Sequence, residues 1–204
     1  MRTYLETIIQ IQIPFNKWIA IYIRIGQAIN LYMRTGNMQR TNSTILSYSY
    51  KDPYLVGDLA RKFTHDEIQE IIDKITTLFR ITDGLPEPVL LFRAIDQRTT
   101  HSSGTIMKMN QFISTSMGLK IMDKFVDAHL PSPNYDDDVW QRKNGSVFRI
   151  LVPAGTKIIY VGGAEHEIIL PPGRFQVIHN IPAEKKRYAE EGKIDVVDVI
   201  YSSF

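Results

Sequence analysis

The chain has 204 residues, of which 44% are hydrophobic and 23% charged, with a formal net charge of +2. These values are ordinary for a folded domain with a core, and so small a net charge gives no indication of nucleic-acid binding by the chain as a whole. Cysteine is absent, which excludes disulfides and thiolate metal sites.

We expect no signal peptide, because the N-terminal residues Met-Arg-Thr-Tyr-Leu-Glu are not followed by a long apolar core. The most apolar window, 18–33, contains Arg24, Gln27 and Asn30 and is too polar and too short to cross a bilayer. A cytoplasmic protein is therefore expected, acting in its own cell or in that of a host. Residues 1–62 carry eight Lys or Arg against three acids. A solvated helix face explains this excess more simply than an acidic partner, RNA or an anionic surface.

Residues 1–86 are predicted to be mainly helical. Residues 9–13 alternate Ile and Gln, which indicates a short strand or an arm packed on the body. Asn16 is a candidate N-cap, and apolar residues then recur at three- and four-residue spacing, which predicts an amphipathic helix closing near Gly36. Residues 37–58 predict loops with at most one short helix. Thr64 and Glu67 match a capping box, which predicts a second helix running to about residue 80.

From residue 87 the pattern changes to short strand-like segments. They are 89–94, 109–115, 146–152, 157–161, 167–170, 174–179 and 195–201, with a helix predicted at 117–130 and a polar loop at 131–143. The short connections favour an antiparallel or mixed arrangement over alternating βαβ units. The prediction is a single α+β domain over 1–204, with helices in 1–86 packed on a strand-rich core in 87–204.

Residues 162–173 form the most unusual stretch: a Gly-Gly pair, then Glu165 and Glu167 one residue apart, then an apolar run ending in Pro-Pro-Gly. Residues i and i+2 of a strand share a face, so both carboxylates can point at one cleft with His166 turned away. Two further segments carry polar residues where strands are usually apolar. One ends in Arg93, and the other contains Ser-Thr-Ser at 114–116 after Phe112.

The order of these motifs resembles that of the mono-ADP-ribosyltransferases of the Arg–Ser–Glu group: an aromatic residue followed by Arg, then Phe-x-Ser-Thr-Ser, then Glu-x-Glu. That group includes binary toxins, Rho-modifying exoenzymes and bacteriophage transferases. The resemblance covers about residues 87–201 and implies a two-sheet catalytic core on which the N-terminal helices pack. It implies NAD as a substrate rather than a resident cofactor. The N-terminal helices have no counterpart that the resemblance places, and they are expected to brace the NAD cleft or to dock a target.

By resemblance, Glu167 stabilises the positive charge that develops on the ribose as nicotinamide leaves, and Ser114 orients that glutamate. Arg93 would bind the diphosphate, since a guanidinium binds phosphate oxygens bidentately. The remaining residues of the implied NAD-binding set support strand and loop geometry or line the site: Phe112, Thr115 and Ser116.

Glu165 is expected to select the acceptor. In the family, glutamate at this position accompanies modification of arginine, and glutamine accompanies modification of asparagine. A guanidinium has a pKa of about 12.5 or more, so a carboxylate is needed to orient it and to take up its proton. The resemblance thus implies an NAD–protein-arginine ADP-ribosyltransferase, a glycosyl-transfer enzyme whose partner is a protein modified on arginine.

Two alternatives stay open at this stage: an NAD glycohydrolase, in which water replaces the acceptor, and a binding module that kept the fold and lost turnover. The histidines show no metal-ligand spacing, so no metal is predicted. Arg149, within a predicted strand, is expected to pair with an acid. Many family members cover nicotinamide with an aromatic or arginine after the Ser-Thr-Ser helix, and the candidates here are Phe125, Tyr135, Trp140 and Arg142.

Overall fold

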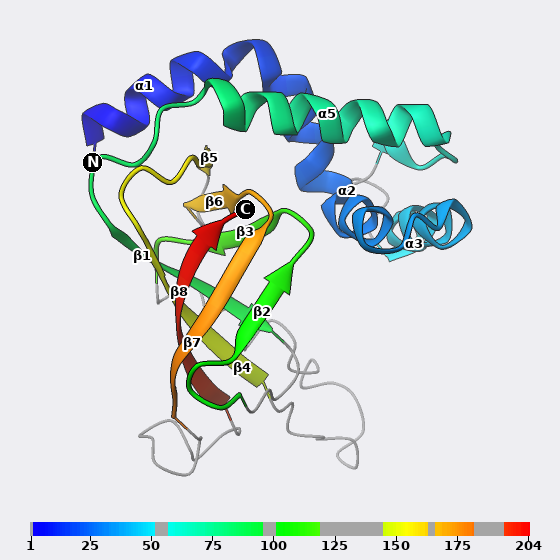
Figure 1. The fold of residues 1–204 in the computed structure, drawn as a ribbon. Helices are drawn as coiled ribbons and strands as arrows, with labels where there is room; N and C mark the ends of the chain where they lie inside the picture. The colour runs from blue at the N-terminus through cyan, green and yellow to red at the C-terminus, as the bar shows by residue number, and fades with distance from the viewer. Residues whose placement is uncertain (1, 52–56, 96–100, 119–144, 163–165, 182–193) are drawn as a thin grey trace, which may run out of the picture.

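The computed structural model describes residues 2–51, 57–95, 101–118, 145–162, 166–181 and 194–204. Figure 1 shows the helices gathered above and beside one end of a twisted sheet, with α1 and α5 lying across it. Residues 119–130 of the helix predicted at 117–130, the loop at 131–143 and the four candidates for covering nicotinamide lie outside the described residues.

The helical part begins the chain. Its helices are α1 (Arg2–Gln12), α2 (Asn16–Thr35), α3 (Met38–Lys51) and α5 (His65–Ile81), with short 3₁₀ turns at Ile13–Phe15 and Gly57–Leu59. Two predicted helix ends are confirmed. Gly36 closes α2 in a left-handed conformation, with φ of 62°, and Thr64 opens α5 with a complete capping box.

The strand part forms one mixed sheet of eight described strands in the order β2-β7-β8-β4-β1-β3-β6-β5, with only β4 and β8 parallel. The strands are β1 (Val89–Ile95), β2 (Ile106–Met109), β3 (Ile113–Ser116), β4 (Gly145–Val152), β5 (Ile159–Gly162), β6 (Glu167–Leu170), β7 (Gly173–Ile181) and β8 (Ile194–Ser203). The α+β class is confirmed. The two halves expected as separate sheets are joined in one ladder where Phe92 of β1 pairs with Ser116 of β3.

The alternating Ile and Gln residues at 9–13 belong to helix α1 and its 3₁₀ extension, so the strand or arm expected there is wrong. The buried face of α1 follows helical spacing instead. Ile8 and Gln12 are 0% and 4% exposed, whereas Ile9 and Ile13 are 42% and 53% exposed. Two of the three isoleucines that made the alternation, Ile9 and Ile13, therefore face solvent.

Two more expectations in this region are corrected. Asn16 is not an N-cap, because the 3₁₀ turn before it runs directly into α2 and Phe15 occupies the cap position without a side-chain bond. Residues 38–51 form a fourteen-residue helix rather than loops. Asn37 caps it by accepting a hydrogen bond from the Arg40 N–H at 2.9 Å. The Thr41 hydroxyl is satisfied by donating to the carbonyl of Asn37 at 2.9 Å.

The segment 109–115, expected as one strand, is divided between two. Met109 ends β2 at one edge of the sheet, whereas Ile113 begins β3, which lies inside the sheet between β1 and β6. Between them Gln111 and Phe112 are 7% and 1% exposed. Phe112 enters the core shared with the helices, and that burial pulls the chain out of the first strand.

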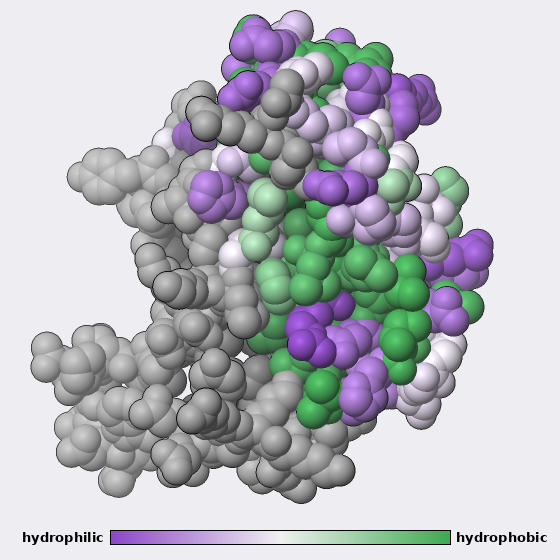
Figure 2. All heavy atoms as spheres, turned by 90° about the vertical axis from the view of Figure 1, so that its left-hand side faces the viewer, coloured by the Kyte–Doolittle hydropathy of each residue, from purple (hydrophilic) through white to green (hydrophobic). Residues whose placement is uncertain are grey.

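Strands β3 and β6 are buried on both faces. Phe112 and Ile169 pack with α2, α3 and α5 in one apolar cluster, while Ile113 and Ile168 pack in a second cluster on the other side of the sheet. Strands β1, β4 and β7, by contrast, each carry an exposed apolar side chain: Leu90, Leu151 and Ile178. One side of the molecule shows apolar residues gathered at its middle (Figure 2).

The capping box predicts a measurable loss of stability. Thr64→Ala removes the hydroxyl that accepts from the Glu67 N–H at 3.2 Å and should lower the free energy of unfolding by about 1 kcal/mol. Urea denaturation followed by circular dichroism measures it. Thr77→Ala in the middle of the same helix is the matched control and should stay within about 0.5 kcal/mol of wild type. Equal losses in both variants would contradict the capping role.

Candidate active site

The site is built on the pairing of β3 with β6. Ser114 lies opposite Ile169 and Ser116 opposite Glu167 in this antiparallel ladder. Since residues two apart share a face, Glu167 and Ile169 both project toward the helices, as do Phe112 and Ser114. The Ser114 hydroxyl donates a hydrogen bond to Oε1 of Glu167. Two residues that are 53 positions apart in the chain are thus in direct contact, as the resemblance implied.

Arg93 joins this pair from β1. Its Nη1 donates to the backbone carbonyl of Ser114 at 2.7 Å, so the guanidinium lies beside the same strand. Burial lowers the pKa of Arg93, while the nearby Tyr22 and Glu167 raise it. A guanidinium stays protonated in proteins despite such shifts. Three predicted site residues from three strands therefore meet in one partly buried, charged cluster.

Helix α2 contributes residues that the sequence reasoning did not assign to the site. The Asn30 amide donates to the Tyr22 hydroxyl at 3.0 Å and to the Phe112 carbonyl at 3.1 Å. Burial raises the pKa of Tyr22, and the charges of Arg93 and Glu167 also act on it. The sequence feature that could have indicated this contribution of α2 is Asn30 itself, a polar residue in the most apolar window of the chain. That the helices brace the NAD cleft or dock a target stays a prediction.

The other residues of the implied NAD-binding set lie around this cluster in different ways. Phe112 is buried against Tyr22, with ring centroids 5.5 Å apart. Thr115 points to the opposite face of the sheet, where its hydroxyl donates to the carbonyl of Ile168 at 2.7 Å. Ser116 accepts from the Gly118 N–H at 3.1 Å, in the turn that leaves β3. Their placement agrees with support of strand and loop geometry; their contact with NAD stays a prediction.

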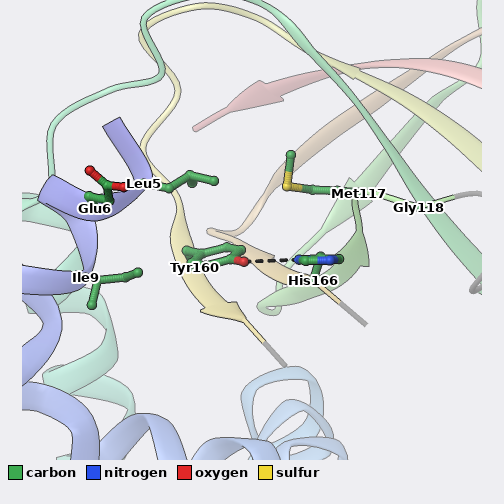
Figure 3. A pocket seen from close by; sticks show the side chains of 7 residues that line it. All are labelled: Leu5, Glu6, Ile9, Met117, Gly118, Tyr160 and His166. Atoms are coloured by element: carbon green, nitrogen blue, oxygen red, sulfur yellow. Dashed lines mark hydrogen bonds between the residues drawn. The ribbon is translucent and has the colours of Figure 1, made fainter. Parts of the chain in front are cut away.

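Glu165 lies outside the described residues, and its role stays a prediction. His166 projects away from Glu167, on the other face of the sheet. There its Nδ1 lies 3.2 Å from the Tyr160 hydroxyl. Both side chains line an open cavity of about 470 Å³ together with Leu5 and Ile9 of α1 (Figure 3). The cavity is therefore separate from the Ser114–Glu167 contact.

Arg149 pairs with an acid, as expected. Its Nε and Nη2 bind the two carboxylate oxygens of Asp198 at 2.5 and 2.7 Å across β4 and β8. Within the described ranges, no group of three or more His, Asp or Glu side chains is placed to hold a metal ion. In the same part of the chain, no helix is long and apolar enough to cross a membrane.

Comparison with known proteins gave matches among solved structures alone. No family model and no curated protein matches the chain. The toxin Plx2a from Paenibacillus larvae is 15% identical over 92% of this chain and 90% of its own, with a TM-score of 0.48. The Vis toxin from Vibrio splendidus is 15% identical over 97% and 86%, with a TM-score of 0.47. C3larvin, also from P. larvae, is 14% identical over 79% and 94%, with a TM-score of 0.46.

All three are ADP-ribosyltransferases by name. Because the identities and TM-scores are this low, an activity can be inferred only from the residues of this chain.

The double hydrogen bond of Asn30 yields a prediction that needs no assay of function. Asn30→Ala leaves the buried Phe112 carbonyl without the donor that it has at 3.1 Å, and should lower the free energy of unfolding by about 1–3 kcal/mol. Asn110→Ala, an exposed asparagine two residues before Phe112, is the control and should stay within about 0.5 kcal/mol. Chemical denaturation of both variants measures the difference. Unchanged stability in Asn30→Ala would show that the Asn30 amide does not stabilise the segment at Phe112.

Proposed function

We propose that the protein transfers ADP-ribose from NAD to an arginine side chain of a target protein and releases nicotinamide. The observation that carries the proposal is the contact of the Ser114 hydroxyl with the Glu167 carboxylate, beside the guanidinium of Arg93. NAD cleavage can use both groups: a carboxylate stabilises positive charge on the ribose, and a guanidinium binds phosphate oxygens.

Glu167 acts on the ribose. Breaking the bond between the ribose C1′ and the nicotinamide nitrogen sends the bonding electrons to nicotinamide and leaves positive charge on the sugar ring, as in glycoside cleavage. A carboxylate held beside C1′ stabilises that charge, and it does so more strongly in a partly buried site than in water. The Ser114 hydrogen bond fixes the orientation of the carboxylate before substrate arrives, so no reorganisation is needed as the charge develops.

Arg93 binds the diphosphate of NAD. One of its five N–H groups is used by the Ser114 carbonyl, an anchor that sets the direction of the planar guanidinium. The remaining N–H groups provide donors of fixed geometry for phosphate oxygens. Burial strengthens this attraction, because it removes competing water from around the charge.

Glu165 receives the acceptor. A guanidinium nitrogen of the target attacks C1′, the new bond forms as nicotinamide departs, and the nitrogen loses a proton that the Glu165 carboxylate takes up. An arginine is otherwise fully protonated near neutral pH and a poor nucleophile. Water in place of the guanidinium gives NAD glycohydrolase activity, the alternative reaction of the same site.

The proposal predicts separate effects for the two glutamates. With labelled NAD and an arginine-rich protein, wild type should label the protein. Glu167→Ala should lower both labelling and nicotinamide release by about a hundred- to a thousand-fold, since the charge on the ribose loses its stabilising group. Glu165→Gln should abolish labelling, because an amide cannot take up the guanidinium proton. Glu70→Gln, an exposed glutamate on α5, is the control and should match wild type.

The same experiment separates the rival functions. Free ADP-ribose without labelled protein would identify a glycohydrolase. No consumption of NAD by the wild-type protein would contradict both enzymatic functions and favour a binding module. Label that survives in Glu165→Gln would contradict arginine as the acceptor.

A further inference from the structure

The residue that precedes the catalytic strand has an unusual backbone conformation. His166 has φ of 45°, and it is the one non-glycine residue with positive φ in the part of the chain that the structure describes. Side chains other than glycine disfavour this left-handed region by about 1–2 kcal/mol. Histidine tolerates this region better than most residues, but it still adopts such a conformation mainly where the surrounding structure holds it there. Glu167 follows directly, so this angle sets the direction in which the chain enters β6.

The side chain of His166 is held by Tyr160. The Tyr160 hydroxyl lies 3.2 Å from Nδ1 of His166, and Tyr160 sits on β5 opposite Ile168 of β6. Both side chains lie on the face of the sheet away from Glu167, beside α1, and Figure 3 shows them pointing toward each other. The contact therefore connects the two strands of the hairpin behind the catalytic residue.

Tyr160 is held in turn by helix α1. The Gln12 amide donates to the Tyr160 carbonyl at 2.7 Å, and Oε1 of Gln12 accepts from the Tyr160 N–H at 2.9 Å. Strand β5 is at the edge of the described sheet, so this pair of bonds takes the place of a neighbouring strand. Gln12 is 4% exposed, and a buried bidentate amide of this kind holds the strand firmly.

We propose that Gln12, Tyr160 and His166 form a positioning chain that holds Glu167 in register with Ser114. The inference rests on the proposed function, because Glu167 is the residue whose placement it explains. None of the three meets the reacting atoms, so they are positioning residues. The physical reason is the two-residue period of a strand: a change of φ at His166 rotates the start of β6 and turns the Glu167 carboxylate away from the Ser114 hydroxyl.

Substitutions can remove one contact of the positioning chain at a time. Tyr160→Phe deletes the hydroxyl alone. His166→Ala deletes the imidazole at a left-handed position, whereas His166→Asn keeps a hydrogen-bonding group and a residue that tolerates positive φ. Tyr4→Phe is the matched control, since it deletes a tyrosine hydroxyl of α1 that donates to the Asp83 carbonyl at 2.8 Å.

The measurement is steady-state release of nicotinamide at varied NAD, with the folded fraction of each variant checked by near-ultraviolet circular dichroism. We expect kcat to fall by about ten- to a hundred-fold in His166→Ala, as for a misplaced catalytic group. Tyr160→Phe should show a smaller fall of about three- to ten-fold. KM should stay within about two-fold of wild type, because the diphosphate site is unchanged. His166→Asn should recover most of the rate, and Tyr4→Phe should match wild type.

Each contrary result has a distinct meaning. Unchanged kcat in both Tyr160→Phe and His166→Ala overturns the positioning chain. So does a rise in KM at constant kcat, which would place His166 in contact with NAD, or a His166→Asn variant as slow as His166→Ala. Nicotinamide release without labelled protein contradicts arginine transfer alone, and the variants still decide on the positioning chain from that release. A wild-type protein that consumes no NAD overturns both proposals.

Discussion

The hydrogen bond between Ser114 and Glu167 depends on the register of β3 against β6, and the rest of the fold secures that register. Both strands are buried on both faces, with Phe112 and Ile169 toward the helices and Ile113 and Ile168 toward the second core. A slip of one residue would exchange these two faces and separate the serine from the glutamate. Apolar packing on either side of the sheet therefore fixes a polar contact in the middle of it.

The helices belong to the site as much as the strands do. Arg93, Tyr22 and Glu167 influence one another electrostatically, and such coupling is strong only where water is largely removed. Helix α2 removes it, and Asn30 satisfies both the Tyr22 hydroxyl and the Phe112 carbonyl at the boundary. A buried polar group without a partner would cost about 1–3 kcal/mol. The helical layer thus makes a charged, partly buried site compatible with a stable core.

Local sequence features predicted what depends on local physics. The capping box at Thr64, the left-handed Gly36 and the bounds of β6 all follow from residues within a few positions of each other. The strand predicted from the Ile and Gln alternation at 9–13 was wrong because tertiary packing decides which residues are buried. In the helix that forms there, the buried residues are Ile8 and Gln12. The proximity of Tyr22 in α2 to Arg93 in β1 depends on contacts between distant segments, and so does the order of the strands. A single sequence does not reveal such contacts.

At the start of β6, two neighbouring side chains project to opposite faces of the sheet. Glu167 projects toward Ser114 and the helices, while His166 projects toward Tyr160 behind it. The two neighbouring side chains therefore occupy different spaces, and His166 can be substituted without touching the Ser114–Glu167 contact. The hairpin of β5 and β6 also ends the described sheet. On this edge strand, Gln12 already binds the backbone N–H and carbonyl of Tyr160. A side-chain amide that occupies these two backbone groups lowers the tendency of the edge to add a foreign strand.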